Sequence, residues 1–313
     1  MNSITKDRSK LGFIGIGAMG SRIAGRLLTH GFQVTVFDRN TTKADALVES
    51  GGIVASSISE LASGSDVVLS SLPSDESVLS VYIGPQGVLD HIHAGSLIIE
   101  MSTVSPDTSR QLHRLGSERG VSVLDVPVSG STSAAEQGLL TLIAGGDEDS
   151  FNSADAIFTA IGKQHFYLGP CGSGNTMKLV VNTLLGVGMQ AIAEAVVFGE
   201  KAGLDRQRLL DVLSKTSLIA PAHLGKLTKA KEYDYRPEFA IGLMNKDFRL
   251  ILETALALGA PMPTTAAAFP INNAEFVDHP DFDFSAVIDR MEEVASVNSA
   301  KQRAEKEPIR LAN

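Results

Sequence analysis

The sequence predicts an α/β fold in which an N-terminal doubly wound sheet is followed by an all-helical C-terminal domain. Two observations predict it. In the first half, short apolar runs alternate with helical patterns, which is typical of βαβ units and a largely parallel sheet. After about residue 170 no further run resembles a strand, and helical segments follow one another. The first of these, at 174–202, is long enough to join the two domains.

Each predicted element has its own signal in the sequence. The strands are short apolar runs bounded by polar or glycine-containing segments: 11–16, 32–38, 66–73, 96–102, 121–128, 139–146 and 164–169. The helices of the second half are 174–202, 205–215, 239–259, 264–277 and 284–297. Gly203 follows the first helix, Asp205 is placed to cap the next, and Asp283 or Ser285 to cap the last. We therefore divide the chain into domains at 10–172 and 173–297 and a polar tail at 298–313.

Composition excludes several classes of protein. The chain has 313 residues, of which 43% are apolar and 20% charged, as in an ordinary globular protein. Its net charge of −9 argues against a nucleic-acid partner and favours a cytoplasmic protein. The uncharged stretch 179–193 is too short and too polar for a membrane span. Cys171 is the only cysteine, and no further ligand is spaced with His91 and His93, so we expect neither a disulfide nor a metal site.

The segment "GFIGIGAMG" predicts a dinucleotide-binding site. Gly15, Gly17 and Gly20 have the G-x-G-x-x-G spacing between a strand and a helix. In this motif the first glycine permits the tight turn, the second lets the backbone approach the pyrophosphate, and the third allows close helix–strand packing. The helix N-terminus then meets the phosphate charge. The residues expected to bind the cofactor are Gly15, Ile16, Gly17, Ala18, Met19 and Gly20. The first domain is therefore predicted to be an NAD(P)-binding Rossmann domain.

The choice of cofactor depends on the end of the second strand. Asp38 can accept the adenosine ribose hydroxyls, and it favours NAD because its charge would repel a 2′-phosphate. The adjacent Arg39 can bind that phosphate or stack on the adenine, so it permits NADP. From these residues the choice between NAD and NADP stays open.

A single lysine begins the long apolar helix. Between Met177 and Phe198 the only charged residues are Lys178 and Glu194. A buried ammonium group is costly unless it is paired or used in chemistry. The alternative is that the aliphatic stem of Lys178 packs on the helix while its charged end reaches water. The helix alone leaves both interpretations open.

Four blocks in order resemble a known family: "GFIGIGAMG", "DVPVSGSTSAAEQG", "GSGNTMKLVVN" and "NKDFRL". The chain resembles the β-hydroxyacid dehydrogenases, which include 3-hydroxyisobutyrate dehydrogenase, tartronate semialdehyde reductase and glyoxylate/succinic semialdehyde reductase. The resemblance extends from about residue 11 to 297. It implies an NAD(P)-dependent oxidoreductase, distantly similar to 6-phosphogluconate dehydrogenase, that acts on a small carboxylate substrate.

The resemblance also implies catalytic and substrate-binding residues. Lys178 matches the family's general acid/base, and Asn182 matches an asparagine that helps to bind substrate. These two residues are spaced i, i+4 and share one helix face. Ser129 and Gly130 match the Ser-Gly pair that holds the substrate carboxylate, largely through backbone N–H groups. The implied reaction is the interconversion of a β-hydroxyacid and its semialdehyde.

Further matched residues lie around the cofactor. Lys246 matches a lysine that reaches the nicotinamide end of the site and contributes to both substrate and cofactor binding, and Asp247 is its neighbour. Leu72–Pro73 and Ser102–Thr103 match positions that line the cofactor.

The chain departs from the family pattern near the substrate loop. Ser131 stands where the family commonly has a second glycine, and Leu139 where it commonly has threonine. Segment 214–225 is expected to line the far side of the pocket, and it lacks the aromatic residue often found there. These departures keep a carboxylate site but leave the substrate open.

Alternative functions and an assembly also follow from the sequence. An imine reductase shares the architecture but usually replaces the lysine that Lys178 matches. A 6-phosphogluconate dehydrogenase would need a longer helical half, and a catalytically silent cofactor-binding module would be expected to lose the lysine. Small residues along the long helix, among them Gly186 and Gly188, admit close packing of another helix. A helix that is apolar on every side must be buried on every side. A second copy of the chain can complete this cover, so we expect a homodimer or homotetramer.

Overall fold

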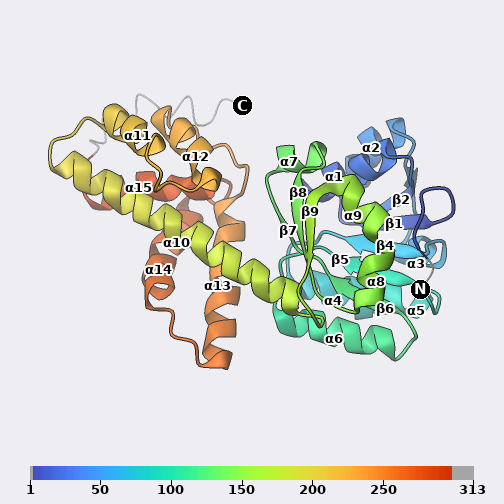
Figure 1. Cartoon of the computed structure of the whole chain (residues 1–313). Helices are drawn as coiled ribbons and strands as arrows, with labels where there is room; N and C mark the ends of the chain where they lie inside the picture. Colours follow the sequence, from blue (N-terminus) through green and yellow to red (C-terminus); the bar gives the residue numbers. More distant parts are fainter. Residues whose placement is uncertain (1–2, 298–313) are drawn as a thin grey trace. The chain divides into compact units, whose positions relative to one another are not determined.

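The computed structural model describes residues 3–297. It consists of two compact units, Met1–Leu179 and Val180–Asn313, which are described separately (Figure 1). The division between them falls inside helix α10 (Ser173–Lys201), whereas the predicted domain boundary coincides with the beginning of this helix. The predicted polar tail, 298–313, lies outside the described residues.

A six-stranded parallel sheet forms the centre of the first unit. The strand order is β3-β2-β1-β4-β5-β6, which is the doubly wound arrangement that the sequence predicts. The strands are β1 (Lys10–Ile14), β2 (Gln33–Phe37), β3 (Ile53–Val54), β4 (Val67–Ser70), β5 (Leu97–Glu100) and β6 (Ser122–Asp125). The order reverses between β1 and β4, and in such sheets ligands bind beyond the carboxyl ends of the strands at this point. The exposed two-residue edge strand β3 was not predicted.

Helices cover both faces of this sheet (Figure 1). Because successive strand residues point to opposite faces, Phe13 packs in one core cluster with Ile23 and Leu69, whereas Ile14 packs in another with Val68 and Tyr82. Burial on both faces explains why the strands are apolar throughout. The helices are α1 (Gly20–Thr29), α2 (Asp45–Glu49), α3 (Ile58–Ser63), α4 (Asp75–Ile83), α5 (Val88–His91), α6 (Pro106–Ser117), α7 (Thr132–Glu136), α8 (Glu148–Ser153) and α9 (Asp155–Ile161), with a 3-10 turn at Thr41–Ala44.

A second, three-stranded sheet corrects one predicted strand. The run at 121–128 is not continuous: β6 ends at Asp125, and β7 (Val128–Ser129) belongs to a separate sheet of order β7-β8-β9. Pro127 lies between them and lacks the N–H that a central strand would donate. β7 pairs antiparallel with β8 (Leu140–Ala144), which pairs parallel with β9 (Gly162–Tyr167).

The second unit is helical, as predicted. Apart from an isolated bridge between Ala240 and Asp283, the described residues after β9 contain only helices and connecting turns. The helices are α10, α11 (Arg206–Ser214), α12 (Pro221–Lys231), α13 (Ile241–Leu258), α14 (Pro263–Asp278), a 3-10 turn at Phe284–Ala286, and α15 (Val287–Val294). Asp205 caps α11 as predicted, and Asp283 caps the 3-10 turn that precedes α15. Helix α12 was not predicted, and it occupies part of the segment expected to line the pocket.

Two glycines of α10 pack against helices of the same chain. A Cβ on Gly186 would lie 2.6 Å from Cζ of Phe248, and one on Gly188 would lie 2.7 Å from Cε1 of His223. These glycines therefore allow α13 and α12 to approach α10 closely. Contacts within one chain explain why small residues stand at these two positions, without a second copy of the chain. By length and composition α10 could cross a membrane, a test that the core helix of a globular protein also passes.

Candidate active site

The glycine-rich loop has two glycines that the chain's own packing requires and one that it does not. A Cβ on Gly15, whose φ is 88°, would lie 2.4 Å from the carbonyl oxygen of Ser71. A Cβ on Gly20 would lie 2.0 Å from the carbonyl oxygen of Gly15. A Cβ on Gly17 would meet nothing within 4 Å. The open space at Gly17 fits a group that approaches the backbone closely, as a pyrophosphate does.

Asp38 is tied to this loop. Its Oδ2 accepts a hydrogen bond of 3.0 Å from the backbone N–H of Ile16, and its Oδ1 accepts one of 2.9 Å from Asn40. Lys43 Nζ lies 3.7 Å from the same Oδ1. Asp38 therefore also fixes the loop conformation, a role that the sequence did not reveal. Arg39, next to it, is exposed.

The structure brings two other predicted cofactor positions together. Ser102 follows β5 and Leu72 follows β4; Ser102 Oγ accepts a 2.7 Å hydrogen bond from the Leu72 N–H. Leu72 Cδ2 would lie 2.9 Å from a Cβ on Gly15, so this turn packs directly against the glycine-rich loop. Pro73 is exposed and Thr103 is half-buried. The loops after β1, β4 and β5 thus form one contiguous edge of the first unit.

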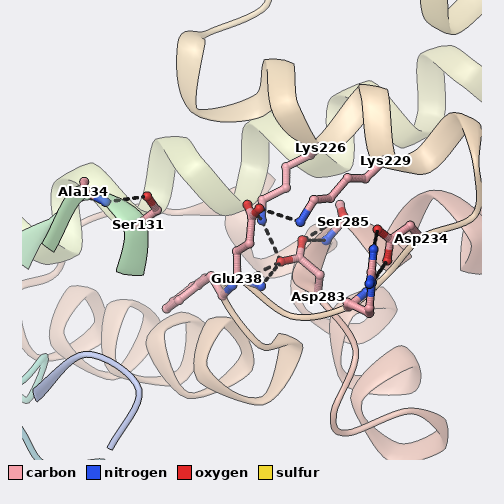
Figure 2. Close-up of polar contacts among 10 residues, drawn as sticks. Ser131, Ala134, Lys226, Lys229, Asp234, Glu238, Asp283 and Ser285 are labelled. Carbon is pink, nitrogen blue, oxygen red and sulfur yellow. Dashed lines mark hydrogen bonds and ion pairs between the residues drawn. The ribbon is translucent and has the colours of Figure 1, made fainter. Parts of the chain in front are cut away.

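The proposed carboxylate loop follows β7. Ser129 is half-buried at the end of the strand, and Gly130, exposed, has a φ of 146° that favours glycine. Ser131 Oγ accepts a 3.1 Å hydrogen bond from the Ala134 N–H and so caps α7 (Figure 2). The departure from the family pattern at Ser131 thus has a local structural role.

Asn182, Asp247 and Lys246 form a polar cluster in the second unit. Asn182 Nδ2 donates to Asp247 Oδ2 at 2.6 Å, and Lys246 Nζ lies 2.9 Å from Asp247 Oδ1. Asn182 and Asp247 are both 1% exposed. Since a carboxylate can only accept here, the amide of Asn182 is oriented with its nitrogen toward Asp247. Among the described residues, Asn182 Oδ1 is buried with no hydrogen-bond partner. Lys178, half-buried, lies one turn before Asn182 on α10.

The sequence interpretation missed an anchor at the beginning of α10. Asp125 ends β6, and its oxygens accept 2.7 Å hydrogen bonds from the N–H groups of Gly172 and Asn175. Asn175 Oδ1 accepts one of 3.0 Å from the Val104 N–H, which links α10 to the loop after β5. Burial raises the pKa of Asp125, although these N–H donors oppose the shift. An acid at the end of an apolar strand was the available signal, as at Asp38.

Glu100 is a second carboxyl group that the sequence interpretation missed. It ends β5, and its Oε1 accepts hydrogen bonds from the Ser102 N–H at 2.9 Å and from Ser70 Oγ at 3.3 Å. The Tyr82 hydroxyl donates to Ser70 Oγ at 2.7 Å. Burial and, to a smaller degree, the negative charge of Asp125 raise the pKa of Glu100 to about 7, against the hydrogen bonds that lower it.

Cys171 is unsuited to nucleophilic catalysis. It is buried, its thiol donates to the Ser109 carbonyl at 3.4 Å, and burial raises its pKa, which disfavours the reactive thiolate. Within residues 3–297, no three His, Cys, Asp or Glu side chains are grouped so that they can hold a metal ion.

Family models match both units. The model for the NAD binding domain of 6-phosphogluconate dehydrogenase matches residues 10–169. The model for the NAD-binding segment of NADP-dependent 3-hydroxyisobutyrate dehydrogenase matches residues 172–291. The chain belongs to the β-hydroxyacid dehydrogenase family. This confirms the predicted resemblance, and it agrees with the dinucleotide site that the open position at Gly17 fits.

Several family members are similar over nearly their whole length. The 2-(hydroxymethyl)glutarate dehydrogenase of Eubacterium barkeri is 36% identical over 291 residues, covering 92% of this chain and 97% of the relative. Glyoxylate/succinic semialdehyde reductase 1 of Arabidopsis thaliana is 37% identical over 281 residues, covering 90% and 97%. The structure of Mycobacterium tuberculosis 3-hydroxyisobutyrate dehydrogenase with L-serine has a TM-score of 0.82 at 33% identity, covering 90% and 98%.

One relative does not have the name of an enzyme. Human cytokine-like nuclear factor N-PAC is 33% identical over 286 residues; the match covers 91% of this chain but only 52% of N-PAC. The relatives of this β-hydroxyacid dehydrogenase family member therefore include a protein whose name does not state an enzymatic activity.

Proposed function

We propose that the chain catalyses the NAD(P)-linked interconversion of a small β-hydroxyacid and its semialdehyde, with Lys178 as general acid/base. The observation that carries this proposal is the cluster of Asn182, Asp247 and Lys246, which begins one helical turn after Lys178. In this cluster Asn182 Oδ1 is a buried acceptor, and Asn182 lies on the same helix as Lys178. Membership of a family of dehydrogenases and reductases supports the same reaction class.

The residues of the first unit fit a nicotinamide dinucleotide. The backbone of Gly15 to Gly20 would hold the pyrophosphate, and Asp38 retains lone pairs for the ribose hydroxyls. When bound, the cofactor would accept a hydride from the substrate carbon or supply one to it. Asp38 favours NAD, while the exposed Arg39 is the feature that permits NADP.

Lys178 would handle the proton of the reaction. In reduction, its ammonium group donates a proton to the oxygen that gains negative charge; in oxidation, its neutral form removes the proton of the hydroxyl group. Asn182, whose amide nitrogen is held by Asp247, presents its carbonyl oxygen as an acceptor for that hydroxyl. Ser129 and the backbone of Gly130 would bind the substrate carboxylate.

A substrate panel tests this function. Small β-hydroxyacids and semialdehydes are assayed with NAD(H) and NADP(H) in parallel, and turnover is followed by the absorbance of the reduced cofactor. We expect turnover of at least one pair, and the ratio of the rates with the two cofactors decides between NAD and NADP. Turnover of cyclic imines alone would identify an imine reductase instead. Dinucleotide binding without turnover of any substrate would identify a silent cofactor-binding module.

We also propose that the chain forms a homodimer or homotetramer. Val180, Leu184 and Phe198 lie on one face of α10 and are 50%, 72% and 77% exposed. Leu256 and Leu258, at the end of α13, are 83% and 73% exposed. Large apolar side chains that share one helix face and lie exposed would be covered by association with a second copy of the chain. Light scattering after gel filtration should give a multiple of 33.1 kDa. The Phe198→Glu substitution should reduce this mass, and a wild-type monomer at micromolar concentration would contradict the proposal.

A further inference from the structure

Three polar residues occupy one row at the carboxyl edge of the large sheet. Ser70 on β4 is paired in register with Glu100 on β5, which is paired with Asp125 on β6. Exposure is 0% for Ser70, 2% for Glu100 and 1% for Asp125. Buried polar groups at this edge stand next to the loops that bind ligands in doubly wound sheets. The reaction proposed above gives a role to none of them.

A continuous series of contacts links Glu100 to the glycine-rich loop. Glu100 Oε1 accepts a hydrogen bond from the Ser102 N–H, and Ser102 Oγ accepts one from the Leu72 N–H. Leu72 and the carbonyl group of Ser71 in turn pack against Gly15. Displacement of Glu100 therefore shifts the turn against which the phosphate-binding loop is built.

The carboxyl groups of Asp125 and Glu100 differ in the hydrogen bonds that they accept from the protein. Asp125 accepts two backbone N–H groups at the beginning of α10, which favour its charged form. Glu100 accepts one backbone N–H and one hydroxyl on Oε1, while its Oε2 is buried with no partner among the described residues. A second buried negative charge beside Asp125 would be uncompensated, so the proton of the pair belongs on Glu100.

We propose that Glu100 is a positioning residue for the dinucleotide and that it acts with its carboxyl group neutral, by holding the Ser102 and Leu72 loops against Gly15. The proposal extends the proposed function, because it presumes that this edge binds NAD(P). Glu100 itself does not contact the dinucleotide. It acts through Ser102.

Ionisation of Glu100 would oppose dinucleotide binding. The ionisable groups that face it are Asp125 on β6 and Tyr82 on α4. Its carboxylate would be repelled by Asp125, its register neighbour on β6, and this repulsion would displace Glu100 from the Ser102 N–H and loosen the Leu72 turn. The pKa of Glu100, raised by burial to about 7, places this change near neutral pH. At pH 8 roughly a tenth of the protein would keep Glu100 neutral, so the apparent Kd would rise up to about tenfold.

The test measures dinucleotide affinity against pH without any substrate. The Kd of NADH or NADPH, whichever binds more tightly, is measured by fluorescence between pH 6 and 8.5. For the wild type we expect the Kd to rise several-fold above pH 7. The Glu100→Gln variant, which is neutral at every pH, should match the wild-type Kd at pH 6 and show no rise. Glu100→Ala should bind more weakly at both ends of the range.

Glu292→Gln is the matched control. Glu292 is 0% exposed, and burial raises its pKa to about 7 as well, but it belongs to the second unit and pairs with Arg206. This variant should keep the wild-type pH dependence of the Kd. A wild-type Kd that is constant across the range, or a rise that persists in Glu100→Gln, would overturn the role of Glu100 and leave the proposed function standing. Failure to bind either dinucleotide at any pH would overturn both.

Discussion

Two lysine–aspartate clusters in the helical unit differ in whether their polar atoms are satisfied. In the closed cluster, Asp283 Oδ2 accepts from Lys226 Nζ at 2.6 Å and from the N–H groups of Glu238 and Phe239 at 3.0 and 3.1 Å (Figure 2). Its Oδ1 accepts from the N–H and hydroxyl of Ser285 at 3.1 and 2.8 Å. Lys226 also pairs with Glu238 at 2.9 Å. This cluster joins α12 to two connecting segments.

The open cluster is the one formed by Asn182, Asp247 and Lys246. It is equally buried at its aspartate, yet it leaves Asn182 Oδ1 with no hydrogen-bond partner in the described part of the chain. Buried polar atoms are nearly always paired, so an orphaned acceptor calls for an explanation. We therefore interpret the closed cluster as structural, and the orphaned acceptor of the open cluster supports the substrate-binding role proposed for Asn182.

Breaking the closed cluster should produce the largest loss of stability. Lys226→Met leaves Asp283 buried without its cation, and the loss of one partner from a buried ion pair costs about 3–5 kcal/mol. Urea unfolding measures this change. Lys229→Met is the matched control on the same helix: its pair with Glu238 is more exposed, and we expect a loss of about 1 kcal/mol or less. Equal losses in the two variants would contradict the distinction between buried and exposed pairs.

Breaking the open cluster should affect turnover more than stability. Asp247→Asn no longer fixes the orientation of the Asn182 amide. A hydrogen bond to a charged group is worth about 1.5–3 kcal/mol, so we expect kcat/KM to fall by about tenfold to hundredfold. Asp283→Asn serves as the matched variant and should lower stability while it leaves kcat/KM nearly unchanged below its melting temperature. The reverse pattern would show that the two clusters have been assigned the wrong roles.

The glycine-rich loop shows a similar contrast: a Cβ on Gly15 would meet atoms of the chain, whereas one on Gly17 would meet none within 4 Å. Gly17→Ala meets no atom of the chain, so its melting temperature should equal that of the wild type. Its methyl group would occupy the approach to the backbone, and we expect dinucleotide Kd to rise roughly tenfold, equivalent to about 1.4 kcal/mol. Gly15→Ala, in contrast, should unfold more readily because of its φ and its contact with Ser71. Unchanged affinity in Gly17→Ala would show that this space is not used by the dinucleotide.

The sequence predicted those elements whose burial follows from local pattern. Strands β1, β4 and β5 are buried on both faces and read as continuous apolar runs, and the helices after β9 carry caps such as Asp205. Helix α12 has weak local signals, because its N-cap residue, Ala220, makes no side-chain hydrogen bond and Gly225 within it has a low helix propensity. The division of the run at 121–128 into two sheets depends on pairing with β8, which no local pattern contains.

The site was predicted less completely for a related reason. The family blocks located Lys178, Asn182 and Asp247, but the hydrogen bond between Asn182 and Asp247 joins residues 65 positions apart. Burial of Lys226 and the pairing of Glu100 with Asp125 likewise arise only when distant segments meet. The family resemblance therefore supplied the candidate groups, whereas their contacts and orientation required the fold.

Turnover of Lys178→Ala, measured with the best substrate of the panel, tests whether Lys178 is the general acid/base. General acid/base catalysis contributes about 10²–10⁴-fold, so kcat should fall by that factor while the dinucleotide Kd and the melting temperature stay at wild-type values. Lys201→Ala, at the exposed end of the same helix, is the control and should retain full activity. Near-normal turnover in Lys178→Ala would contradict a role of Lys178 in proton transfer.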